Sequence, residues 1–573
     1  MKKISLFVLL SVLCVSTNVQ TGVNAQSGEG VWPVLTRIGN TMDVVDSKVC
    51  DILDSDPCVF LIRPADIATG TYIISTPGYY CLTGDATVAG SPAIQINSEN
   101  VTIDLNGQNI MGDGTNDLIN LTSMSEETII KNGTLSCADD AINGNAKRLI
   151  CKDVNFIGGG AAGNTRINLN DSAQGLECID CRFVNTGGVI VPSAPMSRIV
   201  RSVADDDNLH FFKNCIFTGA ESTQISMVVP TFIMHNCVMD FNSSVLGILV
   251  SADRCDMRDC YINGGALNLG GGTVYCFNCV IENVVSIANS ITSDGVFDIG
   301  STDNIRLENC IVRQITGLNG FDIDRDAHSI LKNCVAESIT AGNGNGAGFL
   351  ITSINISNFT HVFEECRAIQ CDLSGFSLGY DGSALLPAQS DHVSFIDCYA
   401  AENGLDGFEV SDGGGTFPSV IEEFGPLFDR CTAEFNNRNG FGLNNLTELN
   451  TSMKDIVLRD CIAKSNLGDG FAFANNVGSR PMNTSLLKNC ISEGNGGNGF
   501  RFGVDTSDFN IFDCCSLNNT GTGFASDGTD NIFMANTSCV NGTDYSGVPL
   551  DKIVSYATTG AVKGVGRWTN ISS

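Results

Sequence analysis

The chain has 573 residues, 43% of them hydrophobic and 17% charged, which is material for a large core and too apolar for a disordered chain. Asp and Glu number 63 against 32 Lys and Arg, so the formal net charge is −31. A field of this sign repels phosphate backbones and anionic headgroups, which argues against nucleic acids and membrane surfaces as partners.

The first 25 residues are typical of a secretory signal peptide. A basic start at Lys2 and Lys3 precedes an apolar run from Ile4 to Val15, and the small residues of a cleavage site end at Ala25. No later segment reaches the ~18 apolar residues of a membrane span. We therefore expect an exported protein without a transmembrane span, located outside the cell, on its surface or in a periplasm.

Residues 26–69 are predicted to form an N-terminal cap that contains an amphipathic helix. Within residues 32–53, apolar residues recur at alternating steps of three and four, which is a helical period with a coiled-coil-like seam. This helix is expected either to cover the end of the repeats that follow or to mediate oligomerisation. The residues of the seam are Leu35, Ile38, Met42, Val45, Val49 and Ile52.

One motif recurs through most of the remaining chain. Its pattern is apolar, any, apolar, any, Asn or Asp, Cys, any, small apolar, as in the segments 304–310 and 485–490, and later repeats add a Gly-Phe pair such as Gly407-Phe408. Apolar residues alternate within each repeat, which is the period of a strand. A unit of this size can bury its apolar face only by stacking on its neighbours. The cysteines that fit the motif are Cys181, Cys215, Cys237, Cys260, Cys279, Cys310, Cys334, Cys366, Cys398, Cys431, Cys461, Cys490 and Cys514.

These repeats resemble those of the right-handed parallel β-helix family, the pectate-lyase-like solenoids. The resemblance implies an all-β solenoid over residues 70–545, with about sixteen coils at the ~4.8 Å spacing of strands, and a C-terminal cap or tail at 546–573. It also implies an asparagine ladder at the position before each repeat cysteine, with Glu365 and Arg430 as departures that predict local loosening. The ladder positions are Asn214, Asn236, Asn278, Asn309, Asn333 and Asn489, with Asp180, Asp259, Asp397, Asp460 and Asp513 as substitutes.

The repeat predicts that most cysteines are unbridged, although an exported chain with 25 cysteines would ordinarily suggest disulfides. Each repeat cysteine shares a face with the small apolar residue two places on, as Cys310 does with Val312, and Cys packs as a small hydrophobe. Parallel side chains on neighbouring coils also suit a disulfide poorly. We expect an interior stack of free thiols.

The two CxxC pairs, at 178–181 and 276–279, have a spacing found in zinc sites. The first cysteine of each pair stands where Leu307 and Leu487 stand in other repeats, so both pairs are expected to fill the core instead of binding zinc. Cys50 and Cys58 lie outside the repeat and are the predicted disulfide.

The resemblance implies two enzymatic alternatives. Lyases of this fold use calcium with acidic residues and a base, and hydrolases use clustered aspartates, but the motifs of polygalacturonases are missing here. The densest acidic spot combines Asp322 and Asp324 with Asp298 of the preceding repeat. These three residues are the candidate catalytic acids, and Asp322 and Asp324 are also candidate calcium ligands. The alternative is a solvated polar patch.

Three functions remain open. The leading expectation is a secreted or cell-surface protein that binds glycans or a protein partner along the side of the solenoid. The first alternative is a carbohydrate-active enzyme, namely a polysaccharide lyase, hydrolase or epimerase, and the second is a structural surface component. The net charge would repel an acidic polysaccharide unless calcium or a local basic groove intervenes.

Overall fold

The structure is a computed structural model that describes residues 60–548, 553–554 and 571–572, apart from short internal segments such as 186–197, 286–294, 324–327, 381–391 and 413–420. The predicted signal peptide, the predicted helix at 32–53 and the predicted Cys50–Cys58 disulfide lie outside the described residues. From Phe60 on, the chain forms one unit. Among its described residues, no helix is long and apolar enough to cross a membrane.

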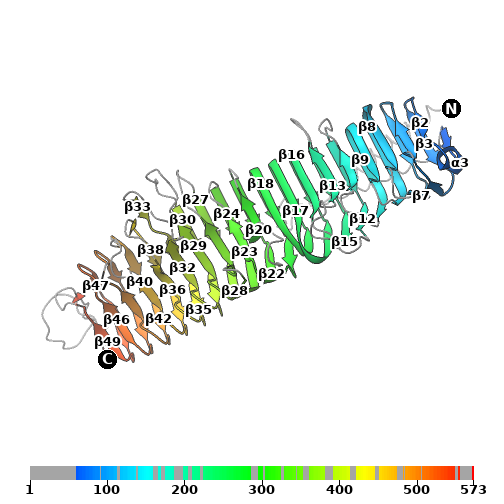
Figure 1. Ribbon diagram of the computed structural model, residues 1–573. Helices are drawn as coiled ribbons and strands as arrows, with labels where there is room; N and C mark the ends of the chain where they lie inside the picture. The colour runs from blue at the N-terminus through cyan, green and yellow to red at the C-terminus, as the bar shows by residue number, and fades with distance from the viewer. Residues whose placement is uncertain are drawn as a thin grey trace, which may run out of the picture. The chain divides into compact units, whose positions relative to one another are not determined.

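The described chain is a parallel β-helix, as predicted: successive coils stack so that strands of neighbouring coils pair in parallel (Figure 1). Each coil contributes to three sheets. Sheet I contains the strands that end two residues before a repeat cysteine, sheet II those that begin just after it, and sheet III the Gly-Phe strands. Five long strands run through more than one sheet: β8 (Ile119–Ser136), β9 (Ile142–Gly158), β16 (Thr223–His235), β17 (Val238–Arg258) and β18 (Tyr261–Phe277).

The other strands of sheet I are β1 (Phe60–Ile62), β3 (Gly78–Leu82), β6 (Val101–Asp104), β11 (Gly175–Ile179), β14 (Leu209–Lys213), β21 (Asn304–Glu308), β24 (His328–Lys332), β27 (Thr360–Glu364), β30 (His392–Ile396), β34 (Leu427–Asp429), β38 (Val457–Arg459), β41 (Leu486–Lys488), β44 (Asn510–Phe512), β47 (Ile532–Met534) and β50 (Ile553–Val554). Those of sheet II are β4 (Ala86–Val88), β7 (Asn109–Gly112), β12 (Arg182–Asn185), β15 (Ile216–Gly219), β19 (Val280–Glu282), β22 (Ile311–Thr316), β25 (Val335–Thr340), β28 (Arg367–Cys371), β31 (Tyr399–Ala401), β35 (Thr432–Glu434), β39 (Ile462–Lys464), β42 (Ile491–Glu493), β45 (Cys515–Leu517), β48 (Thr537–Cys539) and β51 (Ile571–Ser572). Those of sheet III are β2 (Tyr72–Ile74), β5 (Ile94–Ile96), β10 (Thr165–Leu169), β13 (Arg198–Val203), β20 (Gly295–Gly300), β23 (Asn319–Ile323), β26 (Phe349–Thr352), β29 (Phe376–Tyr380), β32 (Phe408–Asp412), β36 (Phe441–Asn445), β40 (Phe471–Phe473), β43 (Phe500–Phe502), β46 (Thr522–Ser526) and β49 (Thr543–Ser546).

The parallel sheets extend beyond the predicted limits of 70 and 545. Strand β1 pairs with β3, and β50 and β51 pair with β47 and β48. A short helix, α3 (Pro64–Ala68), follows β1. Strands β33 (Ile421–Phe424) and β37 (Thr451–Lys454) form a separate two-stranded parallel sheet.

The turn between sheets I and II explains the Asn or Asp before each repeat cysteine. These residues adopt a left-handed backbone, with φ of 54° at Asn214 and 51° at Asn333, which Asn and Asp tolerate better than most residues. Their side chains form the predicted ladder, as where Asn236 Nδ2 donates to Asn214 Oδ1 at 2.8 Å. Glu365 and Arg430 keep the same backbone conformation, so the turn itself persists at both departures.

The interior repeats one residue type per position. Phenylalanines of sheet III stack from Phe321 to Phe524, with the ring centroids of neighbouring coils 4.7 to 4.8 Å apart. The glycine before each of these phenylalanines leaves room for the next coil, since a Cβ on Gly348 would lie 2.7 Å from the Gly375 carbonyl oxygen. The predicted thiol stack is confirmed: twenty described cysteines are free and eighteen of them are buried. The thiol of each repeat cysteine hydrogen-bonds to backbone, as where Cys334 Sγ donates to the Leu307 carbonyl at 3.6 Å.

A second asparagine ladder, buried from Asn403 to Asn519, runs beside the Gly-Phe strands. Asn466 donates through Nδ2 to Asn495 Oδ1 at 2.9 Å and to the Ala433 carbonyl at 3.1 Å, and its Oδ1 accepts from the backbone and side chain of Asn436. Every rung therefore satisfies two buried backbone groups. The described rungs of this ladder are Asn403, Asn436, Asn466, Asn495, Asn519 and Asn541.

One cysteine near the N-terminal end differs from the rest. Cys81 in β3 is disulfide-bonded. Because the twenty other described cysteines are free, its partner lies outside the described residues.

Candidate functional site

The structure places two of the three predicted acids together but shelters one of them. Asp298 and Asp322 are in register on the neighbouring strands β20 and β23. Asn268 donates to Asp298 Oδ2 at 2.7 Å, and Asp322 is only 5% exposed. Asp324 lies outside the described residues. The described structure thus shelters Asp322, where strand alternation suggested an outward position. The catalytic assignment of Asp298, Asp322 and Asp324 stays a prediction.

No metal centre emerges from the described part of the chain. It contains no group of three or more His, Cys, Asp or Glu side chains that could hold an ion. In the CxxC pairs, burial raises the pKa of Cys178 and Cys276 well above the usual thiol value, which disfavours thiolate ligands. Both cysteines fill the core, as predicted. The assignment of calcium to Asp322 and Asp324 stays a prediction.

The structure also joins a serine to a histidine that no motif connects. Ser329 Oγ and His361 Nδ1 are 2.7 Å apart on neighbouring coils. Both residues are at most 1% exposed, so the pair lies inside the solenoid and cannot serve as a nucleophile and base for an external substrate.

A concave surface lies on the outer face of sheet I. Two hollows of about 240 and 310 Å³ share Asp256, Arg258 and Tyr275. The first hollow continues over Phe277 to Arg306 and Glu308, and the second continues to Arg254 and Thr273. We call this combined surface the aromatic groove; it spans β17, β18 and β21.

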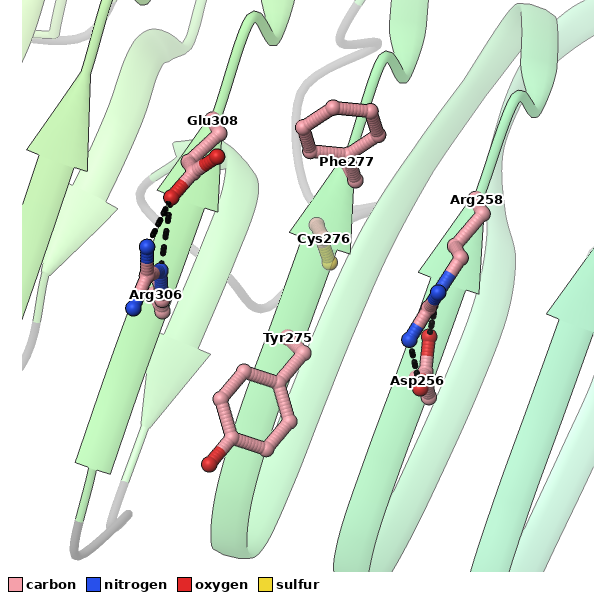
Figure 2. Close-up of a pocket in the computed structure, with 7 residues that line it drawn as sticks. All are labelled: Asp256, Arg258, Tyr275, Cys276, Phe277, Arg306 and Glu308. Atoms are coloured by element: carbon pink, nitrogen blue, oxygen red, sulfur yellow. Dashed lines mark hydrogen bonds and ion pairs between the residues drawn. The ribbon is translucent and has the colours of Figure 1, made fainter. Parts of the chain in front are cut away.

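The middle strand of the groove supplies two aromatic side chains. Tyr275 and Phe277 are each 39% exposed, although both are large and partly apolar. Figure 2 shows them on the strand between the Asp256–Arg258 pair and the Arg306–Glu308 pair. The guanidinium of Arg254 lies 5.9 Å from the centre of the Tyr275 ring. The two aromatic rings therefore lie between cationic groups on the neighbouring strands β17 and β21.

The carboxylates of the groove lie beneath its arginines. Arg258 binds Asp256 through two hydrogen bonds of 2.7 and 2.8 Å, and Arg306 Nε donates to Glu308 at 2.7 Å. The Asp256 side chain is 5% exposed, whereas Arg254 and Arg258 are 56% and 53% exposed. The surface that meets solvent is therefore mainly cationic, in a chain whose net charge is −31.

Asp256 stays ionised because of its partners. Burial raises the pKa of this carboxyl group, but the hydrogen bonds and charge of Arg258, with smaller contributions from His235 and Arg254, outweigh burial and lower the pKa below its usual value. His235 Nε2 lies 3.7 Å from Asp256 Oδ1. The carboxylate thus anchors the cationic side of the groove.

The groove lies apart from the predicted acids: Asp298 and Asp322 stand on strands of sheet III, whereas the groove is on sheet I. Its residues stand two and four places before repeat cysteines: Tyr275 and Phe277 precede Cys279, and Arg306 and Glu308 precede Cys310. Register pairs align Phe277 with Glu308 and Tyr275 with Arg306. Aligning the repeats at the cysteine and reading these two positions would have found the cluster. The buried ladder had a signal too, since its Asn stands four places before the Gly of Gly-Phe, as in Asn466.

Comparisons with known proteins identify no family. No protein-family model matches the chain, and no curated protein matches it. One solved structure that is similar in part is the A-module of the mannuronan C-5 epimerase AlgE6 of Azotobacter vinelandii, with 11% identity and a TM-score of 0.14, covering 84% of this chain and 91% of that chain. A TM-score this low carries no argument about the present protein.

Proposed function

We propose that this protein is a secreted or cell-surface glycan-binding protein, and that an acidic saccharide binds in the aromatic groove. The observation that supports this most is the pair of half-exposed rings, Tyr275 and Phe277, between two strands that present arginines. An aromatic ring offers an apolar surface for the C–H face of a sugar, and guanidinium groups donate paired hydrogen bonds to carboxylate or sulfate oxygens.

The charge distribution favours an acidic ligand over a neutral one. Three arginines with side chains 53% to 57% exposed surround the rings, and Asp256 beneath them is sheltered. The groove is thus the local basic surface that an acidic glycan needs on a chain of net charge −31. Its width of two strand spacings, about 10 Å, suits a single extended saccharide chain.

The first experiment measures retention and chain length of neutral and acidic polysaccharides incubated with the protein, with and without calcium. We expect retention of acidic chains without shortening. Tyr275→Ala should weaken binding about tenfold or more, because one stacked aromatic contact contributes about 1–3 kcal/mol. If the polysaccharide chains are shortened, the protein is an enzyme that cleaves them and not only a binding protein. If Tyr275→Ala keeps the wild-type affinity, the groove is not the binding site.

Sheet II offers a matched control. Tyr399 also lies on an outward strand position, beneath an arginine, with Arg367 5.2 Å from its ring centre. It lacks a neighbouring groove strand with the Arg306–Glu308 arrangement. Tyr399→Ala should therefore leave glycan affinity unchanged, and an equal loss in both variants would indicate a general effect on the fold.

A further inference from the structure

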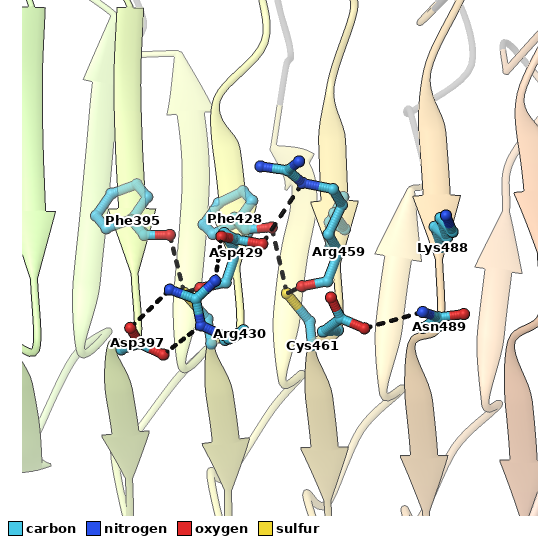
Figure 3. Close-up of polar contacts among 12 residues, drawn as sticks. Phe395, Asp397, Phe428, Asp429, Arg430, Arg459, Cys461, Lys488 and Asn489 are labelled. Carbon is cyan, nitrogen blue, oxygen red and sulfur yellow. Dashed lines mark hydrogen bonds and ion pairs between the residues drawn. The ribbon is translucent and has the colours of Figure 1, made fainter.

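A second cluster on sheet I repeats the construction of the aromatic groove. Asp429 lies under Arg430 and Arg459: Arg430 Nη1 donates at 2.6 Å, and Arg459 Nε is 3.5 Å away. The other two nitrogens of Arg430 donate to Asp397 at 2.7 and 2.8 Å, so Arg459 and Lys488 are the less neutralised cations of the cluster. The side chain of Asp429 is 14% exposed, against 51% and 46% for the two arginines. Lys488 is exposed on the next strand and has no ion pair among the described residues (Figure 3). We call Arg430, Arg459 and Lys488 the distal cluster.

The distal cluster and the groove lie on one line of register pairs. From Phe277 the line runs through Glu308, Lys332, Glu364, Ile396 and Asp429 to Arg459 and Lys488, each residue paired with the next across neighbouring strands. Alternation along a strand places all these side chains on the same face of sheet I. Arg459 is six strand spacings from Phe277, which is about 29 Å.

The surface between the two sites is suited to a sugar chain. Beside the charged line runs a second line of outward residues, two positions earlier in each strand, that is mainly aliphatic: Ile330, Val362, Ser394, Leu427 and Val457. Ile330 is 44% exposed. The two charged side chains of the line on the intervening strands, Lys332 and Glu364, bind each other at 2.9 Å. These strand positions therefore offer apolar contact without net charge, while Glu365 is exposed in the turn beside them.

We infer that the distal cluster is a second anion subsite for the same ligand, so that a long acidic glycan lies along the stack of coils, across the strands of sheet I. This inference rests on the proposed function of the groove. Binding at the second subsite would follow binding at the first within one molecule, so a long chain gains affinity that a short chain cannot. The Gly-Phe strands of sheet III take no part in it.

The experiment compares two uronic-acid oligosaccharides, a short one that covers only the groove and a long one that spans both sites. Wild-type protein should bind the long chain about five- to thirtyfold more tightly, which is the range expected from two exposed ionic contacts. The double variant Arg459→Gln/Lys488→Gln should lose this gain and keep its affinity for the short chain. Neutral Gln avoids placing a new carboxylate beside Asp429.

A control on sheet II changes the net charge equally. Arg367→Gln/Lys464→Gln removes one arginine and one lysine, both outward on β28 and β39. It should leave both affinities unchanged, and a loss equal to that of the distal variant would mean nonspecific attraction and overturn the inference. Equal affinity for short and long chains would also overturn it while leaving the groove intact. If neither chain binds, the proposed function fails as well.

Discussion

Replacing Asn466 by Ala tests how much the buried asparagine ladder contributes. The side chain makes four hydrogen bonds at 2.9 to 3.1 Å and is 1% exposed. After truncation, Asn436 Nδ2 still reaches the Ala400 carbonyl and Asn495 Oδ1 still accepts from the Asn466 backbone. The backbone N–H of Asn436 and the backbone carbonyl of Ala433 then lose the partner that the Asn466 side chain provided. At about 1–3 kcal/mol for each stranded group, the variant should lose about 2–6 kcal/mol of stability.

The assay combines urea unfolding with amide hydrogen exchange, because a solenoid can open coil by coil. Faster exchange at the Asn436 amide is the local signature. Asn309→Gly is the matched control: it removes a rung of the exposed ladder, and Gly adopts the left-handed backbone that Asn309 has at φ 55°. We expect its cost below about 1 kcal/mol, since water replaces the lost contacts. The reasoning would be refuted if both variants lost the same stability and the Asn436 backbone amide stayed protected from hydrogen exchange in Asn466→Ala.

Three further results are expected. Burial lowers the pKa of His361 to about 4, so the unfolded chain binds a proton at this residue before the folded chain does, and stability falls as pH drops from about 6.5 towards 4. Urea unfolding should show up to about 3 kcal/mol of lost stability over this range in the wild type, and His361→Gln should lack this loss. Equal losses in the two proteins would contradict the assignment. Among the described free thiols, Cys515 and Cys539 should react first with an alkylating reagent in the native state, since the others are buried. Peptide mass spectrometry identifies the labelled cysteines, and early labelling of buried thiols would contradict a stack that excludes solvent. Calcium should raise the unfolding temperature of the wild type more than that of Asp322→Asn, with magnesium as a control, and equal shifts would remove Asp322 as a ligand.

The positions that stack from coil to coil were predictable because every repeat shows them. Cys310, Phe408 and Asn309 each recur at a fixed place in the coil, so their alternation predicted strands, buried thiols and the exposed ladder. The buried ladder also has a signal in the sequence, the Asn four places before the Gly of each Gly-Phe pair. However, Asn466 stands in a turn, where Asn is common for conformational reasons alone. Only the structure shows that its amide points inward and bonds to the next coil.

The groove could not be predicted with the same ease, because its members belong to different coils. Arg258 and Tyr275 are 17 residues apart, and Tyr275 and Arg306 are 31 residues apart, so only the stacking of coils brings the three side chains together. Their proximity depends on register, which the cysteine alignment supplies, and on the solvent exposure of the rings, which the sequence does not supply. The burial of Asp322 likewise depends on neighbours that strand alternation cannot reveal.

The architecture of the groove also determines which arginine should be changed to test it. Asp256 is 3% exposed and its burial opposes ionisation, so Arg258 has a structural role in addition to presenting charge. Removing Arg258 would leave a sheltered carboxylate without its main partner; because Arg258 is half exposed and Arg254 and His235 remain 3.7 Å away, the cost should stay below the ~3–5 kcal/mol of breaking a fully buried pair. Arg306 is paired with Glu308, whose side chain is 23% exposed and can be solvated in its absence. Arg306→Gln should therefore lower glycan affinity with little change in stability, whereas Arg258→Gln should lower both, and only the first variant separates recognition from folding.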